Sequence, residues 1–123
     1  MNSNTVDLHI PGGESMRLVA RLATVGYIAS AGVTLDEAED MKIAVAEALG
    51  AVGGERLHVQ FSTADGAVEI AVVGDGKGVP REEVESEIAR YVLRSLADEV
   101  EIEENGAGQI GSIRMKKRLS GGA

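Results

Sequence analysis

The chain has 123 residues, with no cysteine and 2 histidines, which excludes a disulfide framework, thiolate chemistry and cysteine-based metal sites. Its 20 acidic and 12 basic residues give a net charge of -8, which disfavours binding to nucleic acid or to anionic membranes. The 44% hydrophobic content is enough for one core, so we expect a single domain over residues 1–123, with a frayed tail at 120–123 and no bound metal.

The first segment predicts a strand followed by a helix. Val6, Leu8 and Ile10 alternate with polar residues before a Pro-Gly-Gly turn, which is the pattern of a short strand. Apolar residues then recur at helical spacing over residues 14–31. The stripe expected to face the core consists of Leu18, Leu22, Val25 and Ala29.

A second helix is predicted by its cap. Thr34 and Glu37 have the spacing of a capping box, and a Gly-Gly pair at residues 53–54 favours the end of the helix. Between them the apolar residues keep an unbroken spacing of three and four: Ala38, Met41, Val45, Ala48 and Val52.

The remaining chain predicts a hairpin, a glycine-rich loop, a third helix and two closing strands. Two alternating segments around residues 57–61 and 68–72 form the hairpin at the centre of the sheet, and the loop follows at residues 74–80. Pro80 favours the start of a helix to about residue 97, and strands follow at residues 100–102 and 110–119. The inward residues expected in this helix are Val84, Ile88, Tyr91 and Ser95.

This element order predicts an α+β fold, a two-layer sandwich in which helices cover one face of a mixed sheet. The basic residues of the last strand are expected on a solvated edge; they are Arg114, Lys116, Lys117 and Arg118. No apolar segment reaches the roughly 20 residues of a membrane span and no signal peptide is recognisable, so we expect a cytoplasmic protein.

Two features are candidates for chemistry. The loop from Gly74 to Gly78 could bring backbone N–H groups close to a phosphate, although a turn between strand and helix needs such residues anyway. Glu47 lies among apolar neighbours in the second helix, which favours a boundary or pocket position over an exposed one.

Several segments together resemble one family, the anti-sigma-factor serine kinases of the histidine-kinase-like ATPase superfamily. They are the helical segment at residues 43–48, the strand at 68–73 leading into Gly76-Lys77-Gly78, and residues 91–100 and 112–119. The resemblance covers nearly the whole chain and implies the Bergerat-type fold, with a pocket for ATP and magnesium.

The first two nucleotide motifs of that family are each incomplete here. Its E-x-x-x-N motif implies Glu47 as the general base, but Ala51 replaces the asparagine that binds magnesium. Aligning its D-x-G-x-G motif at Gly76 and Gly78 places Gly74 where the aspartate that binds adenine should stand. Asp75 could substitute from one residue further along.

The later motifs are degraded as well. Counting back from residues 98–100, the glycines that cradle the phosphates fall on Glu87 and Ala89, and Ser112 matches the threonine of the final motif. A hydrogen bond to a charged group contributes about 1.5 to 3 kcal/mol, so losing the asparagine and aspartate removes roughly 3 to 6 kcal/mol of nucleotide affinity.

The resemblance therefore implies an anti-sigma-factor-like regulator that acts by protein binding, with Glu47 a vestigial base in a degenerate pocket and with no cofactor. Its expected partners are a sigma factor, an anti-anti-sigma domain, or both, and a second copy of itself. Two alternatives stay open: an active ATP- and Mg-dependent serine kinase that phosphorylates an anti-anti-sigma factor, and a scaffold subunit of a signalling complex.

Overall fold

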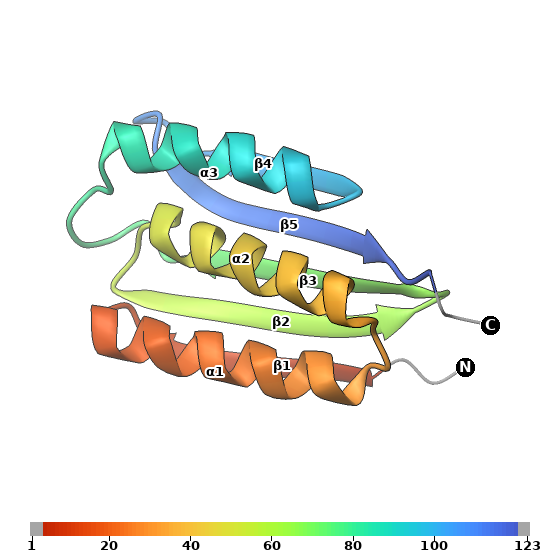
Figure 1. The fold of residues 1–123 in the computed structure, drawn as a ribbon. Coiled ribbons are helices and arrows are strands. Elements are labelled where there is room, and N and C mark those ends of the chain that lie inside the picture. The colour runs from red at the N-terminus through yellow and green to blue at the C-terminus, as the bar shows by residue number, and fades with distance from the viewer. Residues whose placement is uncertain (1–3, 121–123) are drawn as a thin grey trace.

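A computed structural model describes residues 4–120 as two layers, with three helices on one face of a five-stranded sheet (Figure 1). The helices are α1 (Glu14–Ser30), α2 (Leu35–Ala51) and α3 (Glu83–Leu96). The strands are β1 (Asn4–Pro11), β2 (Arg56–Ala64), β3 (Ala67–Gly74), β4 (Glu99–Glu104) and β5 (Ile110–Arg118). The α+β class, the element order and the placement of helices on one face are all confirmed.

The sheet has the order β1-β2-β3-β5-β4, and each of its four neighbouring pairs is antiparallel. The prediction of a mixed sheet is therefore wrong. The crossover through α3 does bring β4 parallel to β3, but the hairpin strand β5 returns between them. The hairpin of β2 and β3, predicted at the centre of the sheet, occupies its second and third positions.

Helix α2 lies between α1 and α3 and begins at the predicted cap (Figure 1). Thr34 Oγ1 accepts from the Glu37 N–H at 3.2 Å, and Glu37 Oε1 accepts from the Thr34 N–H at 2.8 Å. The helix ends at Ala51, just before the Gly-Gly pair. Four of the five apolar residues expected inward are closely packed in or against the core, and Val52 is fully buried just beyond the helix.

Helix α1 presents a different side to the core from the one predicted. Its buried residues include Ala20, Thr24 and Tyr27, and the Tyr27 ring stacks on Phe61 at 5.3 Å. The predicted inward stripe faces solvent instead: Leu18, Leu22, Val25 and Ala29 are exposed. The error arose because α1 carries apolar residues on two sides, and spacing alone does not choose between them.

The same error affects α3. Ala89 and Leu93 are its fully buried residues, and this helix packs beside α2. The side expected to be inward, comprising Val84, Ile88, Tyr91 and Ser95, is exposed. Small alanines on both helices allow the close α2–α3 approach, and this packing outweighs the larger apolar residues on the opposite side.

The basic residues of β5 do not form a solvated edge, because β5 lies inside the sheet between β3 and β4. On the sheet face without helices, Glu99 of β4 pairs with Arg118 at 2.8 Å and with Lys116 at 3.9 Å. On the helix side, Lys117 lies 3.3 Å from Asp40 of α2. The cluster is thus largely paired within the protein.

The end of the chain continues from β5 towards the start of α2. At Ser120, the first residue of the tail expected to fray, the backbone N–H donates to Glu37 Oε2 at 2.6 Å. The rest of that tail, residues 121–123, lies outside the described residues.

Within residues 4–120, no helix combines the length and apolar character that crossing a bilayer requires.

Candidate functional site

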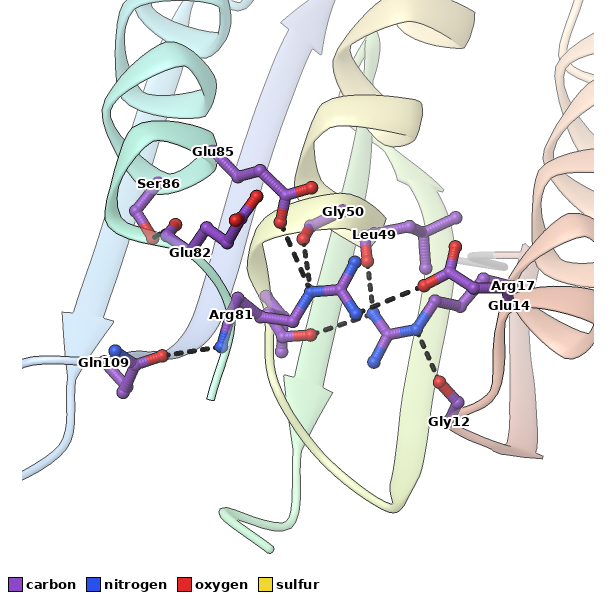
Figure 2. Close-up of polar contacts among 11 residues, drawn as sticks. Gly12, Glu14, Arg17, Leu49, Gly50, Arg81, Glu82, Glu85, Ser86 and Gln109 are labelled. Atoms are coloured by element: carbon purple, nitrogen blue, oxygen red, sulfur yellow. Dashed lines mark hydrogen bonds and ion pairs between the residues drawn. The ribbon is translucent and has the colours of Figure 1, made fainter. Parts of the chain in front are cut away.

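The region expected to hold a nucleotide lies at the end of the molecule where α2 ends and α1 and α3 begin (Figure 1). Glu47 and Ala51 occupy successive turns of α2, and the loop from Gly74 to Gly78 follows β3 nearby. A close-up shows that two arginine side chains, Arg17 and Arg81, converge on this end of α2 (Figure 2).

Arg17 comes from α1 and closes the end of α2. Its Nε donates to the Gly12 carbonyl at 2.6 Å, and its Nη1 donates to the carbonyl of Leu49 and, at 2.9 Å, to that of Val52. The last carbonyls of a helix lack partners within the helix, and α2 has no basic residue in its own last turn. Only 4% of Arg17 is exposed, so this guanidinium is a buried cap from another element.

Arg81 adds a second cap from the loop that precedes α3. Its Nε donates to the Gly50 carbonyl at 2.7 Å, and its Nη1 lies 3.2 Å from Glu14 Oε1 of α1 (Figure 2). Glu85 lies 3.7 Å from the same Nε, and the Arg81 N–H donates to Gln109 at 3.0 Å. Arg81 therefore connects all three helices to the β4–β5 loop.

The two guanidinium groups influence each other electrostatically. Burial lowers the pKa of Arg17 and the charge of Arg81 lowers it further, whereas Glu14 and Glu85 raise it. Arginine remains protonated at any physiological pH, so the region carries two cations balanced by two carboxylates. The Nε and Nη1 groups of both arginines donate to carbonyls or a carboxylate of this chain.

Residue 74, where the family resemblance implies an adenine-binding aspartate, is closed by backbone. A Cβ atom at Gly74 would lie 1.9 Å from the Gly53 carbonyl oxygen, far inside van der Waals contact. The segment that follows α2 therefore packs directly on the end of β3. No side chain fits at residue 74 unless this segment moves.

Asp75, the possible substitute, is engaged within its own loop. Its Oδ1 accepts from the backbone N–H of Lys77 at 3.0 Å and from that of Glu55 at 2.9 Å. These bonds, first that of Lys77, lower the pKa of Asp75, and they hold the carboxylate against the backbone. The side chain thus stabilises the turn, in which Gly76 and Gly78 adopt φ of +76° and +90°.

A cavity beside this loop is small. It measures about 140 Å³ and is lined on one side by residues 76–80 and on the other by the β4–β5 loop and the start of β5. Sites that enclose a drug-sized ligand usually measure roughly 300 to 1,000 Å³. This volume falls short of what an enclosed nucleotide needs.

The remaining predicted residues are not brought together. Glu47 is half-buried on α2, whereas Ala51 is fully covered. Glu87 and Ala89 lie within the continuous helix α3, the former exposed and the latter fully buried, so this part of the chain forms no phosphate loop. Ser112 lies on the face of the sheet away from the helices, where its Oγ donates a hydrogen bond to Glu103 Oε1 at 3.2 Å.

Sequence reasoning missed Arg17 and Arg81, the residues that define this region. One signal was available for them. A well-capped helix that ends without a basic residue needs a donor for its last carbonyls, and Arg17 lies off the predicted stripe of its own helix.

Among residues 4–120 there is also no group of three or more histidine and acidic side chains arranged to hold a metal ion.

No protein-family model and no curated protein matches the chain. Its structure is similar to the crystal structure of the RsbU and RsbW domains of Rv1364c from Mycobacterium tuberculosis, with a TM-score of 0.68 and 18% sequence identity. The match covers 94% of this chain and 32% of that chain, so the present chain spans about a third of its length. At this identity the match shows a shared fold, the one implied by the resemblance to the anti-sigma-factor serine kinases.

Proposed function

We propose that this chain is an anti-sigma-factor-like regulator that acts in the cytoplasm by binding other proteins, without a working ATP site. The observation that carries the proposal is the closed end of α2. Arg17 and Arg81 occupy its carbonyls, and the Gly53 backbone occupies the space that an aspartate at residue 74 would need. A fold that keeps its partner surfaces but lacks this pocket can still act by association.

Magnesium and ATP do not fit the donor set of this region. Ala51 offers no oxygen for a metal, and Asp75 Oδ1 already accepts from two backbone N–H groups. These residues disfavour the serine kinase alternative. The scaffold alternative differs from the proposal only in the number of partners that bind at once.

Calorimetry with Mg-ATP and a kinase assay together test the loss of the ATP site. With a millimolar Kd, 1 mM Mg-ATP stabilises the protein by only about 0.4 kcal/mol, so we expect no resolvable heat and almost no change in Tm. We also expect no phosphate transfer from labelled ATP to an anti-anti-sigma domain of the same organism. Saturable micromolar binding, or transfer that Glu47→Gln abolishes, would establish the kinase instead.

Protein binding needs its own test. We expect a purified sigma factor or anti-anti-sigma domain of the same organism to form a complex with this chain in the absence of nucleotide. Glu47→Gln should leave that complex unchanged, because without metal and phosphate the carboxylate has no proton to abstract. Absence of any complex with either class of partner would reject the proposed function.

Self-association is part of the proposal, and α1 supports it. The exposed side of α1 carries four large apolar residues, namely Leu18, Val19, Leu22 and Val25, but only two charged side chains, Glu14 and Arg21. Two copies of a molecule of net charge -8 repel each other, and a nearly neutral contact surface adds the least to that repulsion. The adjacent edge strand β1 also lacks a row of glutamates like the one on β4, which hinders that other edge from pairing with a strand of another chain.

A further inference from the structure

Helix α3 exposes a row of large apolar side chains, which we call the α3 stripe: Val84, Ile88 and Tyr91. Their exposed fractions are 65%, 50% and 77%. The three residues are spaced by four and three positions and lie on the side of α3 opposite to Ala89 and Leu93, which are fully buried. Within the described chain nothing covers this row, and a contiguous apolar surface of this kind marks an interaction site.

Acidic side chains surround the N-terminal half of the α3 stripe. Glu82, Glu83 and Glu87 are exposed, and none of the three forms an ion pair within residues 4–120. The spacing on the helix places Glu83 and Glu87 along one flank of the stripe. Residues 82–96 contain four glutamates and two arginines, a net charge of -2.

The nearby arginines do not neutralise these carboxylates. Arg81 is held by Glu14 and Glu85, and Arg90 is paired with Glu104 of the neighbouring strand β4. Arg94 is the remaining cation of α3, one turn beyond Tyr91 and at the far end of the stripe. The electrostatic potential over the first turns of α3 is therefore negative, and its carboxylates are free to pair with a partner.

We propose that the α3 stripe binds a basic amphipathic helix of a partner protein, an assignment that rests on the proposed protein-binding function. Apolar side chains of that helix would cover Val84, Ile88 and Tyr91, and its lysines or arginines would face Glu83 and Glu87. A second copy of this chain is disfavoured as the occupant, because two acidic α3 helices repel each other. An anionic membrane is disfavoured for the same reason.

The test uses a synthetic Leu/Lys amphipathic helix of about 18 residues as the probe, with a Leu/Glu version as the charge control. Amide NMR titration of the full chain reports both the affinity and the residues contacted. We expect saturable binding of the Leu/Lys probe, with the largest shifts over residues 83–95. Raising the salt from about 0.05 to 0.5 M should weaken this binding several-fold as the Debye length shortens.

Two sets of variants separate stripe binding from general attraction to an acidic protein. Val84→Ser with Ile88→Ser and Tyr91→Ser should raise the Kd at least about tenfold. The matched control at exposed apolar positions of α2, Leu35→Ser with Ile43→Ser, should leave it unchanged. All of these positions are exposed, so circular dichroism should show folded variants.

The second set of variants tests the role of charge. Glu83→Gln with Glu87→Gln should raise the Kd of the Leu/Lys probe about threefold or more at low salt. Its control removes two exposed carboxylates elsewhere, with Glu55→Gln and Glu101→Gln, and should have a smaller effect. Equal binding of the Leu/Glu probe, shifts outside α3, or affinity insensitive to the stripe variants would overturn the inference. If the inference about the α3 stripe fails while a sigma factor or anti-anti-sigma domain still binds, the partner binds elsewhere on the surface and the proposed function stands.

Discussion

Arg17 is the residue on which the end of α2 depends. Replacing it with alanine removes charge-assisted donors from the carbonyls of Leu49 and Val52 and leaves a gap under α1. We expect Arg17→Ala to lower the free energy of unfolding by about 2 to 4 kcal/mol, measured by urea denaturation. Arg21→Ala, an exposed change on the same helix, is the control and should alter stability by no more than about 0.5 kcal/mol. Similar losses in both variants would contradict the capping role.

Gly74 tests whether one substitution can supply the adenine-binding aspartate that the family resemblance implies at this position. In Gly74→Asp the new Cβ meets the Gly53 carbonyl, so the segment after α2 must move. We expect a loss of about 2 kcal/mol or more in the free energy of unfolding and no gain in Mg-ATP affinity by calorimetry. Gly50→Ala, where an added Cβ meets nothing within 4 Å, should leave stability unchanged or higher. A stable Gly74→Asp variant that binds ATP would show that the pocket needs only this aspartate.

At the scale of elements, the sequence predicted local features such as a helix cap, but it did not predict which side of a helix faces the core. The capping box of α2 was correct because it depends on Thr34 and Glu37 within one turn. Helices α1 and α3 each carry apolar residues on two sides, so their orientation depended on neighbours distant in sequence. The same holds for the site: the alanine at residue 51, where the resemblance implies an asparagine, is evident from the sequence, whereas Arg81 reaches Gly50 only in the folded chain.

The start of α2 predicts an acid sensitivity. The backbone N–H groups of Ser120 and Thr34 lower the pKa of Glu37 from 4.5 to about 2. The unfolded chain therefore binds the proton first, so this contribution is complete above pH 4.5 and is lost as the pH falls towards 2. We expect the free energy of unfolding to decrease over that range, measured by denaturation at each pH.

The variant Glu37→Gln should be less stable at pH 7 and should show a shallower decrease between pH 4.5 and 2. Glu39→Gln, on the same turn of α2 but exposed and paired with Lys42, serves as its control. It should keep the pH dependence of the parent protein. A slope that Glu37→Gln leaves unchanged would assign the acid sensitivity to other carboxylates.

At the scale of the whole molecule, the distribution of charge separates the surfaces available to partners. Three of the four basic residues of β5 lie beside glutamates of β4, and the fourth, Lys117, pairs with Asp40 of α2. They therefore offer little free positive charge to steer an incoming partner. Three exposed carboxylates that form no ion pair within the described chain, Glu82, Glu83 and Glu87, lie beside the α3 stripe, whereas the exposed side of α1 is nearly neutral. A partner guided by charge should therefore approach α3, whereas an identical copy should approach α1.

This separation predicts a dimer that the α1 surface controls. We expect sedimentation equilibrium at high micromolar concentration to give twice the 12.8 kDa mass of one chain. Leu22→Glu places a charge at the centre of the exposed side of α1, and in a symmetric interface that charge appears on both copies, so the dimer dissociation constant should rise at least about tenfold. Val84→Glu makes the matched change on the exposed side of α3 and should leave the dimer intact. A parent protein that sediments as a monomer would remove self-association from the proposal, and a dimer weakened only by Val84→Glu would assign the interface to α3.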